Sequence, residues 1–137
     1  MEELDPKFRA GMKNTMAEAL GMELVEAKPG RVVITMPVDH RTHQPYGLLH
    51  GGASVALAET AASLGGWLLV AGEGKVVVGQ EINANHLRSV RSGKVKAVGE
   101  VIHQGKASQV WETKIYDEQE RLVCISRCTL AVIEPRA

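Results

Sequence analysis

One carboxylate stands apart from every other charge in the centre of the chain. Glu59 is the only formally charged residue between Arg41 and Glu73, and it sits in a run of alanine, valine and leucine. A glutamate at the helix surface, or one paired with a cation, is the plainer interpretation. Because an unpaired charge is costly to bury, we favour a carboxylate with a shifted pKa in a dry cleft, acting as nucleophile or general base.

A second chemical feature, the tripeptide His50-Gly51-Gly52, comes just before this apolar run. The first N–H groups of a helix have no partner within the helix, and the positive end of the helix dipole lies behind them. Such donors can polarise a carbonyl group and stabilise an oxyanion, and a glycine lets a substrate come close. The motif alone is weak, since glycine is common near helix starts.

The spacing of the two features has a consequence for assembly. Glu59 lies eight residues after Gly51, which is about 12 Å along a helix, so one chain cannot present both to one carbonyl. Two copies of the helix packed antiparallel across a two-fold axis bring Glu59 of one subunit to Gly51 of the other. The sequence therefore predicts a homodimer with two interfacial sites, in which Ser63, one turn after Glu59, can hold the carboxylate or a water molecule.

The elements that must position these residues can be predicted from periodicity. An alanine-rich helix is expected from residue 51 to about residue 71, buried on most sides. A shorter helix should run from Asp5-Pro6 to Gly21, with Phe8 and Met12 on its apolar side. Alternating or apolar stretches predict strands over 22–27, 31–38, 75–90, 93–103, 107–116 and 121–133.

The connections between these elements indicate the architecture. Residues 39–49 form a loop, and the short turns at 91–93, 104–106 and 117–120 favour antiparallel neighbours. One buried helix among six extended segments predicts an α+β fold, with a single antiparallel sheet curled around the helix in the hotdog arrangement. With 137 residues, the chain 1–137 is expected to be one domain.

Composition excludes several classes of protein. Sixteen basic and sixteen acidic residues cancel, so no broad field favours nucleic acid or an anionic membrane. Residues 1–21 carry charges where a secretory signal has an apolar core, so we expect a cytosolic protein without a membrane span. Cys124 and Cys128, about 13 Å apart if both lie in one strand, are predicted to be buried free thiols.

Common catalytic signatures of other classes are missing from the sequence. His40, His43 and His50 do not match a zinc-binding spacing, so no metal is expected. The chain has no G-x-S-x-G elbow of a serine hydrolase and no glycine-rich nucleotide-binding motif.

The segment from Met36 to Thr60, which contains HRTHQPYGLLHGGASVALAET, resembles hotdog thioesterases that hydrolyse 1,4-dihydroxy-2-naphthoyl-CoA and related aroyl thioesters. The stretches EINANHLRS (81–89), QVWE (109–112) and Asp117-Glu118 resemble the same family, and the similarity runs from about Gly21 to Ile133. The resemblance implies an acyl-CoA thioesterase that needs no cofactor beyond the CoA of its substrate. It also implies a homotetramer built as a dimer of dimers.

The resemblance further implies a role for each matching residue. The residue matching Glu59 is nucleophile or general base, and that matching Gly51 donates its N–H to the thioester oxygen. Gln44 and His50 match residues that orient the carbonyl and the helix end, and Ser63 matches one that assists water or carboxylate. This sequence keeps all five residues.

Substrate contacts are predicted more broadly from residue type. Cations and turn amides suit the phosphates of CoA, and a glycine at the helix start leaves room for substrate, although each position could also be a solvated strand end. The candidates are Gly52, Arg88, Ser89, His103, Gly105 and Lys106, with His86 either lining the acyl pocket or structural.

Two other functions fit the same residues. A hotdog dehydratase or hydratase would pair His86 or His50 with an acid, and a non-catalytic acyl-CoA sensor would only bind. The acyl group, the choice between CoA and acyl carrier protein, and the choice between nucleophilic and general-base catalysis stay open at this stage.

Overall fold

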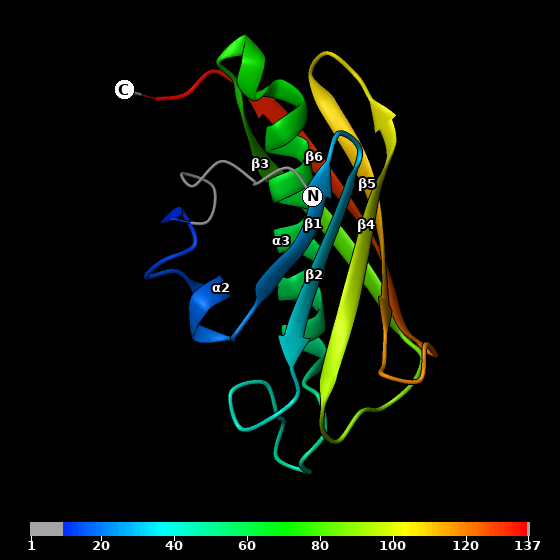
Figure 1. Cartoon of the computed structure of the whole chain (residues 1–137). Coiled ribbons are helices and arrows are strands. Elements are labelled where there is room, and N and C mark those ends of the chain that lie inside the picture. The colour runs from blue at the N-terminus through cyan, green and yellow to red at the C-terminus, as the bar shows by residue number, and fades with distance from the viewer. Residues whose placement is uncertain (1–9, 137) are drawn as a thin grey trace.

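One long helix lies along one face of a six-stranded sheet in the computed structural model, which describes residues 10–136 (Figure 1). The helix is α3 (Gly51–Val70), followed by one 3-10 turn, η1 (Ala71–Glu73). The strands are β1 (Glu23–Lys28), β2 (Arg31–Pro37), β3 (Val76–His86), β4 (Lys94–Gln104), β5 (Ser108–Tyr116) and β6 (Leu122–Ile133). The predicted α+β hotdog layout is confirmed.

The sheet is antiparallel throughout, in the order β1-β2-β4-β5-β6-β3. The prediction of antiparallel neighbours for most of these strands is confirmed at the turns 104–106 and 117–120, whereas the strands on either side of 91–93 do not pair with each other. Strand β3 pairs with β6 over its length, and the N–H groups of Leu87 and Arg88 then donate to the Val123 carbonyl. Residues 87–93 therefore cross below the sheet, and β3 forms one edge of the sheet while β1 forms the other.

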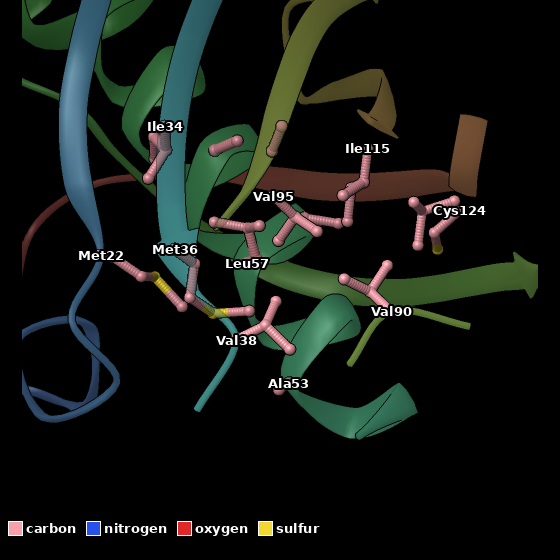
Figure 2. Packing of buried hydrophobic residues seen from close by; sticks show 14 of the residues in the cluster. Met22, Ile34, Met36, Val38, Ala53, Leu57, Val90, Val95, Ile115 and Cys124 are labelled. Carbon is pink, nitrogen blue, oxygen red and sulfur yellow. The ribbon is translucent and has the colours of Figure 1, made fainter. Parts of the chain in front are cut away.

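The core lies between the sheet and one side of α3 (Figure 2). Leu57 of α3 is fully buried and packs with Ile34, Val95 and Ile115 from three strands. Small residues let the second half of the helix approach the sheet closely, since a Cβ at Gly66 would lie 2.5 Å from Leu130 Cδ1. This close packing fixes the orientation of α3, and with it the residues that remain on its open side.

One side of α3, which we call its open side, is less buried than the sequence predicted. The apolar sequence predicted burial on most sides, yet Val55, Ala56, Glu59 and Thr60 are only half-buried. Residues Gly51–Glu73 are long and apolar enough to span a membrane, a property that core helices share. In this fold the helix is a core helix with one face left uncovered by its own chain.

Residues 10–21 are less helical than predicted. Asp5, Pro6 and Phe8 lie outside the described residues, and the α2 helix covers only Met16–Ala19. Asn14 adopts a left-handed φ of 60°, which interrupts the expected helix, and Gly21 follows with φ 76°. Met12 still packs against the core as predicted from its spacing.

Candidate active site

Glu59 projects from the open side of α3 toward the edge strand β3. A Cβ built on Gly79 of β3 would lie 3.1 Å from Glu59 Oε2, so the carboxylate rests against that strand. Within residues 10–136 the carboxylate makes no hydrogen bond and no ion pair. A glutamate paired with a cation therefore does not describe this protomer, whereas the alternative of a glutamate at the helix surface stays open, because Glu59 is half-buried.

The negative charge of Glu59 also affects the buried thiol of Cys128. Cys124 and Cys128 are buried and free, as predicted. Burial raises the pKa of the Cys128 thiol to about 11, with further contributions from the charges of Glu59 and Glu81. Burial also raises the pKa of Cys124. Both thiols stay protonated near neutral pH, so neither is the nucleophile.

A cleft of about 510 Å³ opens beside Glu59, and we call it the Glu59 cleft. One wall is the open side of α3, and the other is the N-terminal segment. Ser63 and Gly52 share this cleft with Glu59, which confirms that Ser63 lies on the same side of the helix. The lining residues are Gly11, Met12, Thr15, Met16, Ala17, Gly52, Val55, Ala56, Glu59, Thr60, Ser63 and Leu64.

At the start of α3, one of the backbone N–H groups that were predicted to be unpaired is already hydrogen-bonded. The Gly52 N–H donates to Nδ1 of His50 at 2.7 Å, so the helix N-cap uses this donor. The next two amides, of Ala53 and Ser54, donate to the His50 carbonyl. In the described part of the chain the Gly51 N–H has no partner, which leaves it as the open donor at this end of α3.

A second cleft of about 410 Å³ surrounds this donor, and we call it the Gly51 cleft. The Gln44 side-chain oxygen accepts from the Tyr46 N–H, and its amide NH₂ makes no hydrogen bond within residues 10–136. The His86 ring lies over the helix start, since a Cβ on Gly51 would be 2.9 Å from His86 Nε2. The lining residues are Gln44, Leu48, Leu49, Gly51, Ser54, His86, Leu87, Arg88, Ser89 and Val123.

The predicted site residues thus fall into separate groups within one protomer. Glu59 and Ser63 lie in one cleft, and Gln44, Gly51, His86, Arg88 and Ser89 lie in the other. His103, Gly105 and Lys106 are in neither, because His103 lies near the end of β4 and Gly105 and Lys106 follow it, whereas Arg88 and Ser89 precede this strand. Strand β4 has eleven residues, so at about 3.3 Å per residue its two ends are about 33 Å apart.

Two parts of the site were not singled out from the sequence. Gly79 touches the Glu59 carboxylate, and a lone glycine within a strand pattern is a signal of such a close approach. Met12, Thr15 and Met16 line the Glu59 cleft. Their sequence shows an apolar helical spacing, which indicates packing but not which surface is covered.

Comparisons with known proteins show which family this chain resembles in sequence. Residues 46–124 match the thioesterase superfamily. The Bacillus subtilis protein ComA2 is 62% identical over 90% of this chain and 98% of its own length. The 1,4-dihydroxy-2-naphthoyl-CoA hydrolase of Listeria monocytogenes is 50% identical over 88% of this chain and 98% of its own.

Solved structures share the fold over almost the whole chain. The crystal structure of thioesterase HI1161 from Haemophilus influenzae superposes with a TM-score of 0.88 at 52% sequence identity. That match covers 91% of this chain and 87% of the other. A further relative by sequence, the proofreading thioesterase EntH of Klebsiella pneumoniae, is 50% identical over 92% of this chain and 91% of its own length.

Proposed function

Because this chain belongs to the thioesterase superfamily and is a thioester hydrolase, we propose that its substrates are aromatic acyl-CoA thioesters and that Glu59 carries the catalysis. Membership in this family argues against the dehydratase and acyl-CoA sensor alternatives. The observation that carries the proposal is the unpaired Glu59 carboxylate in a cleft beside an open face of α3.

The proposed chemistry uses groups that the site leaves free. Glu59 either attacks the thioester carbonyl carbon, giving an acyl-enzyme anhydride and the CoA thiolate, or takes a proton from a water molecule that attacks instead. The negative charge that develops on the carbonyl oxygen is stabilised by the N–H of Gly51, a donor at the positive end of the helix dipole. Ser63 offers a hydroxyl to the carboxylate or the water.

A two-fold dimer is part of the proposal, because Glu59 and Gly51 lie in different clefts. Strand β3 supports it: it is an edge strand of eleven residues, mostly exposed, with a row of backbone groups ready for pairing. Glu59 lies beside Gly79, and Gly51 lies beside His86 of the same strand. Antiparallel pairing of two β3 strands centred near residues 82–83 sets Gly79 opposite His86 of the partner subunit, and so sets Glu59 near the partner's Gly51.

The acyl group is assigned to the Glu59 cleft. Its volume of about 510 Å³ lies within the usual range of small-molecule sites. Small and methionine side chains form most of the lining, and the hydroxyls of Thr15, Thr60 and Ser63 provide polar contacts. An aromatic acyl group that carries hydroxyl substituents matches this lining, and a similar protein is named a 1,4-dihydroxy-2-naphthoyl-CoA hydrolase.

The CoA moiety is assigned to the Gly51 cleft. Arg88 and Ser89 line it and suit phosphate oxygens. His103, Gly105 and Lys106 lie at the far end of β4, so in this proposal they contact the same CoA only from another subunit. The tetramer implied by the resemblance stays a prediction.

Replacing Glu59 by glutamine tests the proposed function. Glu59→Gln keeps the size of the side chain but removes the negative charge, so thiol release should fall by about 10³-fold or more. Initial rates of thiol release would be measured with hydroxynaphthoyl-, benzoyl- and long-chain acyl-CoA and with an acyl carrier protein thioester. We expect the aromatic substrates to have the highest kcat/KM.

A matched control is Glu73→Gln, which neutralises an exposed carboxylate just beyond the same helix. Its rates should equal those of the wild type. A folded Glu59→Gln protein that releases thiol near the wild-type rate would refute the catalytic role of Glu59.

A further inference from the structure

Gly79 is the residue of β3 that the Glu59 carboxylate faces. A Cβ at this position would lie 3.1 Å from Glu59 Oε2, 3.2 Å from Cδ and 3.5 Å from Oε1. The three nearest atoms therefore all belong to one carboxylate. The side of the strand on which a side chain would stand is already occupied by the group that the proposed reaction needs.

The φ angle at Gly79 does not require a glycine. Five other glycines have a left-handed φ, but Gly79 is not one of them, so an alanine could adopt its conformation. Glycine within a strand weakens that strand, and it often marks a bulge or the close approach of another group. Here the approaching group is Glu59.

The strand geometry around Gly79 is also irregular. The pairing register between β3 and β6 shifts between Gly79 and Glu81, so Gln80 forms a β-bulge. Bulges bend a strand locally and re-aim the side chains near it, and they are common next to active sites. The bulge and the missing side chain together shape the surface against which the carboxylate rests.

We propose that Gly79 is a positioning residue that reserves the space of the Glu59 carboxylate and so holds its reactive orientation. The inference rests on the proposed catalytic role of Glu59. Within residues 10–136, no hydrogen bond or ion pair holds this carboxylate. Its orientation before substrate binds is therefore set by the shape of its surroundings, of which Gly79 is the closest part of the sheet.

The substitution Gly79→Ala tests this role. The added methyl group must displace the carboxylate by a few tenths of an ångström or rotate it, and misplacing a reacting group by about 1 Å can cost about 10²-fold in rate. We expect kcat to fall between about 4- and 10-fold with a much smaller change in KM. Gly72→Ala is the matched control, since a Cβ there has no atom within 4 Å and the φ is ordinary.

A double substitution separates positioning from a general disturbance of β3 or of the assembly. Glu59→Asp withdraws the carboxylate by one methylene, so Gly79→Ala added to Glu59→Asp should lower kcat by less than about threefold. An equal loss in both backgrounds, or an unchanged kcat in Gly79→Ala, would overturn the inference. Failure of the proposed function itself gives a different result, which is full activity of Glu59→Gln.

Discussion

At the scale of single residues, the site depends on a charge with nothing to neutralise it inside its own protomer. Glu59 is half-buried and rests against Gly79, and the nearby Cys128 thiol is held protonated by burial and by neighbouring carboxylates. Ser63 is the hydroxyl one helical turn away in the same cleft. In the proposed mechanism the carboxylate is therefore free to act on substrate or water, and Ser63 assists it.

Ser63→Ala measures the contribution of that helper. A single hydrogen bond is worth about 1 kcal/mol net, which corresponds to about a fivefold change in rate. We therefore expect kcat to fall by about this factor, far less than in Glu59→Gln. Steady-state rates of thiol release, measured for both variants under the same conditions, give the size of the Ser63 contribution. A loss as large as that of Glu59→Gln would make Ser63 a primary catalytic group.

Some of these residues could be found from sequence and others could not. Glu59 and Ser63 were predictable because an isolated charge in an apolar helix and a spacing of four residues are local features. The contact of Gly79 with Glu59 depends on how β3 packs against α3, which is set by pairing with β6 far along the chain. The capping of Gly52 by His50 was missed because a histidine is an unusual N-cap residue.

At the scale of elements, α3 places both chemical groups. Its N-cap histidine takes the Gly52 N–H and leaves the Gly51 N–H open, and its close packing on the sheet keeps Glu59 on the uncovered side. The ends of α3 matched the prediction closely, because a long alanine-rich run between two glycine-containing turns has few other conformations. The neighbours of β3 in the sheet were not predicted, because the length of a turn does not show whether the two strands that it joins pair with each other.

His50→Ala tests the cap. Loss of the side-chain acceptor for the Gly52 N–H should lower the free energy of unfolding by about 1 kcal/mol. His50→Asn is the matched variant, since asparagine is a preferred N-cap residue and should restore most of this stability. Chemical denaturation of the three proteins decides the point, and equal stability of wild type and His50→Ala would show that the hydrogen bond contributes nothing.

At the scale of the whole molecule, the proposed dimer makes the two clefts of one chain halves of two different sites. Strand β3 is an exposed edge, and α3 has an uncovered side directly behind it. Both features are explained by a second copy that continues the sheet across β3 and brings its own α3 alongside. The distance between Glu59 and Gly51 along one helix, about 12 Å, is the basis on which the sequence predicts this dimer, and the dimer stays a prediction.

The most direct test of this shared site is subunit complementation. Glu59→Gln and Gly51→Val proteins are each expected to be nearly inactive, the first without its carboxylate and the second with a side chain over its open amide. Mixed by co-expression, they form heterodimers in which one of the two sites is intact, so about a quarter of wild-type thiol release should return for random pairing. If the mixture is no more active than its components, the two groups do not act across subunits and the account is contradicted.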